Sequence, residues 1–82
     1  METIIRLKIN KELDPITDKK ILKLKGNLIT LGFTDIIHIN DEGLEHHINF
    51  FTIDTQKSNM VKDYLMTYIE EAFLSEKIEI MY

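Results

Sequence analysis

Hydrophobic and polar residues alternate near the start of the chain and again at its end. A period of two residues is typical of a strand with one face in the core, so strands are predicted over residues 3–10 and 78–82. The inward-facing residues are Ile5, Leu7 and Ile9 in the first strand, and Ile78, Ile80 and Tyr82 in the last.

Two longer stretches carry apolar residues at helical spacing instead. The first is opened by Asp14 as N-cap and Pro15 at the first helical position, and Gly32 after Leu31 has the form of a C-cap. The second has Ser58 as its N-cap and is expected to run to about Leu74. The predicted core stripes are Ile21, Leu24, Leu28 and Leu31 in the first helix, and Val61, Leu65, Tyr68, Ile69 and Ala72 in the second.

Between the helices, residues 36–39 and 48–53 are rich in β-branched and aromatic side chains, which favours two strands of a hairpin. The segment from Asn40 to Gly43 suits a turn, because glycine takes a positive φ at little cost. A three-residue loop would set His38 opposite His46, and a two- or four-residue loop would set it opposite His47.

The predicted order is βαββαβ in a single domain, residues 1–82. Two right-handed βαβ crossovers that share a hairpin predict an α+β, ferredoxin-like sandwich: a four-stranded antiparallel sheet of order 4-1-3-2 with two helices on one face. The second hairpin strand is apolar on both faces, with Ile48 and Phe50 on one and Phe51 and Ile53 on the other. A chain of this size rarely covers both faces itself, so another molecule is a candidate to cover the open one. The candidate interface residues on that face are Ile4, Phe50 and Phe51, of which the hairpin register selects one Phe.

The net charge of −4 is unevenly distributed along the chain. Residues 1–34 hold seven Lys or Arg against four Asp or Glu, whereas residues 35–82 hold three against ten. An acidic half disfavours nucleic acid and anionic membrane and favours a protein partner with a basic surface. The chain has no cysteine, no apolar run of signal-peptide length and no stretch near the roughly 20 apolar residues that cross a bilayer, so we expect a cytoplasmic protein.

No catalytic or cofactor motif is present, and we expect neither catalysis nor a cofactor. The three glycines are isolated at positions 26, 32 and 43, so no glycine-rich loop could hold a phosphate. His38 with His46 or His47 is the one group of residues with metal-ligand character. Adjacent histidines of a strand point to opposite faces, so at most two of the three could share a metal ion. The default interpretation is that the histidines are solvated. Arg6 and Lys8 near an exposed Phe are the features that would suit RNA, yet no RNP-like run accompanies them.

The layout resembles PurS, the small accessory subunit of formylglycinamidine ribonucleotide synthase. The similarity lies in Leu13-Asp14-Pro15, Leu31-Gly32-Phe33 and the ending Lys77-Ile78-Glu79-Ile80-Met81-Tyr82. The Arg-x-Gly-Lys segment of that family is replaced here by His38-Ile39-Asn40-Asp41-Glu42-Gly43. The resemblance therefore implies a shared topology, and no residue role or activity is carried over.

The sequence favours a small acidic, noncatalytic protein-binding module. Immunity proteins, antitoxin-like inhibitors and phage-encoded inhibitors have this size and charge, because they occlude basic nucleic-acid-binding surfaces. The candidate partner-binding residues are Asp41, Glu42, Glu45, Glu70 and Glu71. One alternative is an accessory enzyme subunit that dimerises through the open sheet face, and a minor alternative is a histidine-based metal-binding module.

Overall fold

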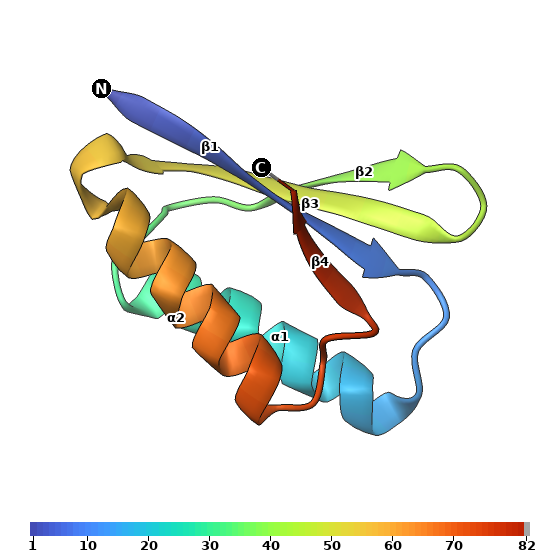
Figure 1. Cartoon of the computed structure of the whole chain (residues 1–82). Coiled ribbons are helices and arrows are strands. Elements are labelled where there is room, and N and C mark those ends of the chain that lie inside the picture. Colours follow the sequence, from blue (N-terminus) through green and yellow to red (C-terminus); the bar gives the residue numbers. More distant parts are fainter. Residues whose placement is uncertain (82) are drawn as a thin grey trace.

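The computed structural model describes residues 1–81 and shows an α+β fold with one open antiparallel sheet (Figure 1). The elements, in chain order, are β1 (Glu2–Asn10), α1 (Pro15–Thr30), β2 (His38–Glu42), β3 (His46–Asp54), a short 3-10 helix (Thr55–Lys57), α2 (Ser58–Glu71) and β4 (Ile78–Met81). The strand order β2-β3-β1-β4 is the predicted order counted from the other edge, and it is consistent with a ferredoxin-like arrangement. In the described part of the chain no helix is long and apolar enough to cross a membrane.

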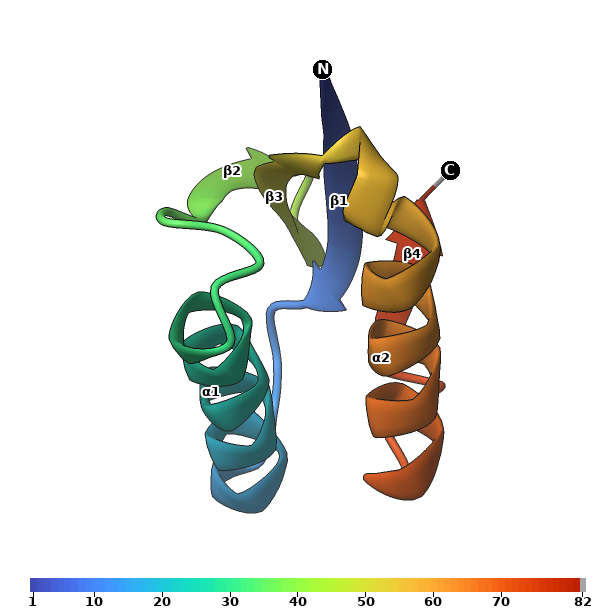
Figure 2. The ribbon, with the colours of Figure 1, turned by 90° about the vertical axis from the view of Figure 1, so that its left-hand side faces the viewer.

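Both helices lie on the same side of the sheet, as the end-on view shows (Figure 2). The core lies between these layers, and its fully buried side chains include Leu7, Leu24, Leu28, Phe51, Ile53, Leu65 and Val61. The helices are also joined by polar contacts: the Tyr68 hydroxyl donates to the Lys20 carbonyl at 2.8 Å, and the Asn27 amide donates to the Tyr64 hydroxyl at 3.0 Å. Burial raises the pKa of Tyr68. The other face of the sheet has no helix over it.

The predicted limits of α1 are confirmed. The Asp14 carboxylate accepts a hydrogen bond from the backbone N–H of Thr17 at 2.6 Å, and Pro15 is the first helical residue. Gly32 has a φ of 77°, and the next N–H, from Phe33, donates to the Leu28 carbonyl, which closes the helix. The prediction that Leu31 lies in the core is wrong: it caps the helix and is 53% exposed.

The predicted limits of α2 need two corrections. Ser58 is the first residue of the helix and not its cap, because a 3-10 turn precedes it and Asp54 accepts the N–H of Gln56 there. The helix ends at Glu71 and not near Leu74, because Phe73 adopts a φ of 58° and the Leu74 N–H turns back to the Ile69 carbonyl at 2.8 Å. The last strand begins at Ile78 as predicted, whereas Tyr82 lies outside the described residues.

The predicted hairpin register is wrong in both of its alternatives. His38 pairs with Phe50, and the strand continues through Asp41 opposite His47 and Glu42 opposite His46. Three of the four residues assigned to the turn, Asn40, Asp41 and Glu42, therefore belong to β2, and residues 36 and 37, assigned to the strand, precede it. The loop lies further along, at residues 43–45, because only there does the chain reach glycine with a φ of 68°. The two facing imidazoles that both registers required do not occur.

Candidate functional site

The tip of the β2–β3 hairpin presents an apolar side chain among carboxylates. Gly43 begins the loop in the left-handed region, which an L-residue rarely adopts, and Leu44 follows it with 95% of its surface exposed. Glu42 and Glu45 stand on either side of this pair and are also exposed. Leu44 takes no part in the core, and with Glu42 and Glu45 it forms an exposed tip of one apolar and two acidic side chains.

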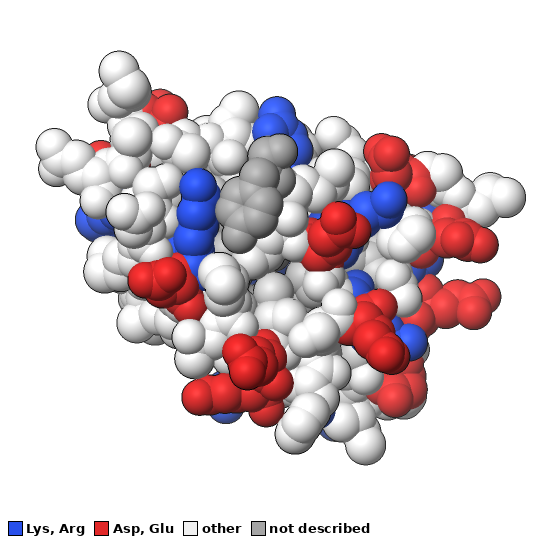
Figure 3. Space-filling view, viewed as in Figure 1, with Lys and Arg blue, Asp and Glu red and all other residues white. Residues whose placement is uncertain are grey.

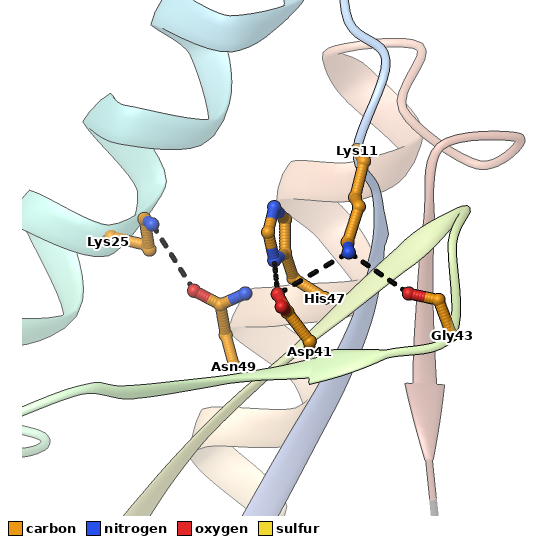
Figure 4. A network of polar contacts seen from close by, with 6 residues as sticks. All are labelled: Lys11, Lys25, Asp41, Gly43, His47 and Asn49. Atoms are coloured by element: carbon orange, nitrogen blue, oxygen red, sulfur yellow. Dashed lines mark hydrogen bonds and ion pairs between the residues drawn. The ribbon is translucent and has the colours of Figure 1, made fainter.

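Lys11, which follows β1, fixes this tip from the neighbouring strand (Figure 4). Its backbone N–H donates to the Glu45 carbonyl at 2.8 Å, and its Nζ donates to the Gly43 carbonyl at 3.0 Å. The same Nζ lies 3.5 Å from Asp41 Oδ1. The loop is therefore attached at both of its ends to a residue outside the hairpin, which limits the conformations that it can adopt.

Asp41 differs from the other predicted acidic residues because its carboxylate has partners within the molecule. Besides Lys11, His47 Nδ1 lies 3.1 Å from Asp41 Oδ1, directly across the hairpin (Figure 4). Asn49, two residues further along β3, is buried and accepts a hydrogen bond from Lys25 Nζ of α1 at 3.2 Å. Asp41 thus helps to hold the tip, whereas the carboxylates of Glu42 and Glu45 have no ion-pair partner in the described part of the chain.

A shallow concavity of about 240 Å³ lies beside Leu44. Its lining comes from the end of β1, the following loop and the hairpin, through Asn10, Glu12, Leu44, Glu45 and His46. The carboxylates of Glu12 and Glu45 give this concavity an acidic wall.

Glu70 and Glu71 lie apart from the hairpin tip, at the end of α2 in the other layer of the molecule (Figure 1). The structure therefore divides the five predicted acidic residues into two groups. Carboxylates at a helix C-terminus face the negative end of the helix dipole. The last turn of α2 has no basic residue of its own, and the cation at this end is Lys20 of α1, whose Nζ donates to the Ala72 carbonyl at 3.0 Å. Glu70 and Glu71 thus raise the negative potential at a place where folding alone favours a cation.

The open sheet face carries Ile4, which is 47% exposed, and Phe50, whereas Phe51 is fully buried under the helices. Of the three residues predicted for this interface, only Ile4 and Phe50 can meet another molecule. The Phe50 ring stacks on His38 with 4.9 Å between centroids and 21° between planes. Arg6 and Met81 continue this row on β1 and β4.

The three histidines do not converge. His38 and His46 lie four residues apart on the paired strands, where the rise per residue is about 3.3 Å, and His47 points to the other face toward Asp41. Among residues 1–81 no group of three His, Asp or Glu side chains could hold a metal ion.

Three residues with a role in these surfaces were not among the sequence predictions: Lys11, Leu44 and Phe73. Leu44 could have been noticed as one leucine inside the polar stretch from Asn40 to His47. The part played by Lys11 depends on the pairing of β1 with β3, which no local pattern indicates. Phe73 is 87% exposed and is the non-glycine residue with a positive φ in the described chain.

No family model, curated protein or solved structure matches the chain.

Proposed function

We propose that the protein is a small acidic, noncatalytic binding module that uses the tip of its β2–β3 hairpin to occlude a basic surface of a partner protein. The observation that supports this most directly is Leu44, fully exposed between two carboxylates on a loop that Lys11 holds in place. An inhibitor or immunity-type protein of the cytoplasm is the class that this combination suits best.

The chemistry of the tip suits recognition of a basic, partly apolar surface. An apolar anchor that enters a pocket on the partner supplies affinity, and a charged rim supplies orientation and a fast, salt-sensitive encounter. A loop that is already ordered loses less conformational entropy on binding than a free loop would. Leu44 is the anchor in this proposal, and Glu42 and Glu45 are the rim.

The test is capture of partners from a lysate of source cells by wild-type protein and two variants. The tip variant carries Glu42→Lys and Glu45→Lys, and the control carries Asp35→Lys and Asp63→Lys, which change the charge equally at exposed sites elsewhere. The proposal expects one near-stoichiometric protein with wild type and control, lost with the tip variant and released as salt rises.

Capture that is equal for all three baits would overturn the placement at the tip. Leu44→Ser separates the anchor from the charges: it should raise the off-rate of the captured partner and leave the salt dependence unchanged.

A second candidate, an accessory subunit that dimerises through its open sheet face, has its own support. Ile4, Ile48, Phe50 and Met81 line one hollow on that face together with Arg6. A second copy would bury these side chains, and Phe50→Asp should then convert a dimer to a monomer in analytical ultracentrifugation. A wild-type protein that stays monomeric at high concentration would rule out this candidate.

A further inference from the structure

The outer face of the helical layer carries opposite charges on its two helices. α1 and α2 lie side by side on one side of the sheet, and in residues 1–81 no element covers their outer surfaces (Figure 2). α1 holds four lysines and one aspartate, whereas α2 holds one lysine and three carboxylates. The layer therefore presents a basic helix next to an acidic one.

The start of α1 lies beside the end of α2, because the two helices are antiparallel. The Tyr68 hydroxyl and the Ala72 carbonyl, at the end of α2, are both hydrogen-bonded to Lys20 of α1, at 2.8 and 3.0 Å. Further along α1, Asn27 donates to Tyr64, which is nearer the start of α2. The exposed charges that share the first end of the layer are Lys19 and Lys23 on α1 and Glu70 and Glu71 on α2.

These four side chains lie on the outer side of the layer and have no counter-charge of their own. Within residues 1–81 none of them forms an ion pair. Lys19 and Lys23 are four residues apart on one helix face, where like charges repel. In the space-filling view a group of acidic side chains covers the end of α2 (Figure 3). An opposite charge from outside the chain would relieve both pairs.

The other charged residues of the two helices lie outside this area. Lys20 and Lys25 are hydrogen-bonded within the chain. Asp18 is seven residues before Lys25 and therefore lies on the same flank of α1, toward β3. Lys62 lies on the flank of α2 that borders β4, and Asp63 is nearer the start of that helix.

The outer side of the layer also suits contact with another helix. Gly26 lies there on α1, and a Cβ at this position would meet no atom within 4 Å, so a second helix can approach closely. The apolar side chains of the two helices that are more than half exposed are Ile16, Leu22, Met60 and Met66.

We propose that the helical layer joins two copies of the chain in a symmetric dimer, in which α1 of each copy lies against α2 of the other. The two-fold axis runs between the helices and parallel to them. Such an axis places each part of α1 opposite the part of the second α2 that lies at the same level. Lys19 and Lys23 therefore meet Glu70 and Glu71 of the partner subunit, and the symmetry makes this contact twice.

The side-by-side placement of opposite charges favours a second copy over a partner of one charge sign. A basic or an acidic segment that spans both helices would meet like charge on one of them. A copy turned about this axis meets opposite charge on both, because the surface is complementary to itself.

The same symmetry has a consequence for the hairpin tip. The tip lies at the end of the molecule where α1 begins (Figure 1). An axis parallel to the helices therefore keeps both tips at one end of the dimer. If the tip binds as proposed above, the dimer presents two such sites together, which raises the avidity for a partner with two matching surfaces.

The experiment is sedimentation equilibrium of the full chain and of two charge-reversed variants, from about 10 µM to 1 mM. The α1 variant carries Lys19→Glu and Lys23→Glu, and the α2 variant carries Glu70→Lys and Glu71→Lys. Each variant sets like charges against each other in a dimer of itself, so each should dimerise at least about tenfold more weakly than wild type. An equimolar mixture of the two should form a heterodimer with about the wild-type affinity, because both of its contacts again join opposite charges.

Three controls separate this contact from other effects of charge. A chain with all four substitutions keeps the net charge of −4 and should dimerise like wild type. Glu42→Lys with Glu45→Lys changes the charge as much as the α2 variant does, but at the hairpin tip, and should leave the dimer unchanged. Phe50→Asp, on the open sheet face, should also leave it unchanged. The charge variants alter only exposed side chains, so they should fold, as circular dichroism will show.

Three results would overturn the proposal: a wild-type protein that stays monomeric at about 1 mM, a dimer that either charge-reversed variant retains, or a mixture of the two variants that stays monomeric. A dimer that Phe50→Asp abolishes and the charge-reversed variants retain would assign self-association to the open sheet face. The lysate experiment changes other residues, so its outcome leaves this result unaffected and the two proposals are tested independently.

Discussion

The backbone N–H of Lys11 donates to the Glu45 carbonyl at 2.8 Å, which extends the pairing of β1 with β3 by one step beyond Asn10 and His46. The end of the hairpin loop is therefore hydrogen-bonded to the segment that follows β1. In the proposed function this relationship lowers the entropic cost of binding, because the geometry of the tip is set before a partner arrives.

Lys11→Met should loosen the tip without unfolding the protein. The substitution keeps the aliphatic stem and the backbone bond but removes the Nζ contacts with Gly43 and Asp41. We expect a loss of about 0.5–1 kcal/mol in the free energy of unfolding, since these contacts are partly exposed. Amide exchange at residues 43–45 should become faster, as measured by NMR. Lys23→Met on the exposed side of α1 is the control, and equal exchange in the two variants would contradict the role of Lys11.

Phe50 and Phe51 should respond very differently to truncation, although they are neighbours. Phe51→Ala removes a fully buried ring from the core and should cost about 3–5 kcal/mol in urea denaturation. Phe50→Ala removes a half-exposed ring from the open face and should cost about 1 kcal/mol, mostly from the lost contact with His38. Similar costs for both would mean that β3 is turned over relative to the register described here.

The sequence was sufficient for the elements that repeat a long pattern. Ile5, Leu7 and Ile9 alternate through a strand and Ile21, Leu24 and Leu28 recur through a helix, and each set is buried as predicted. Asp14 and Gly32 mark the ends of α1 through local chemistry alone, so they too could be recognised.

Local sequence patterns could not predict the hairpin register, and the reason is physical. Asn40 to Gly43 has the composition of a turn, but a turn preference is small compared with the pairing that β2 gains by continuing to Glu42. Asp41 reaches His47 and Lys11 only in the longer register, and Lys11 belongs to a distant segment. The same distance explains why the five predicted acidic residues could not be divided into two surfaces before the fold was known.

Asp14 should make the stability of the protein depend on pH in the acidic range. The hydrogen bond from Thr17 lowers the pKa of the Asp14 carboxyl below its ordinary value of 3.8. A carboxylate whose pKa is lower in the folded state stabilises that state above the ordinary pKa, and the contribution is lost as the pH falls through the folded-state value. Asp14→Asn keeps a capping oxygen but cannot titrate. As the pH is lowered from neutral to about 2–3, the wild type should therefore lose more stability than Asp14→Asn. The difference between their urea midpoints should shift accordingly in favour of the variant. A difference that is independent of pH would contradict this assignment.

Phe73→Gly should stabilise the protein. Phe73 occupies the left-handed region with a φ of 58° just after α2, at a position where glycine is the usual residue, and 87% of its surface is exposed. The left-handed conformation costs an L-residue about 1–2 kcal/mol, whereas glycine adds about 0.4–1 kcal/mol of unfolded-state freedom, so a net gain of about 0.5–1 kcal/mol is expected in urea denaturation.

Phe73→Ala is the matched control, because it removes the same exposed ring but keeps the Cβ that makes this conformation unfavourable. It should leave stability nearly unchanged, and a loss of stability in both variants would show that the ring packs on the protein. Backbone strain of this kind persists where the surrounding structure holds it, and here the Leu74 N–H, one residue further on, donates to the Ile69 carbonyl at 2.8 Å.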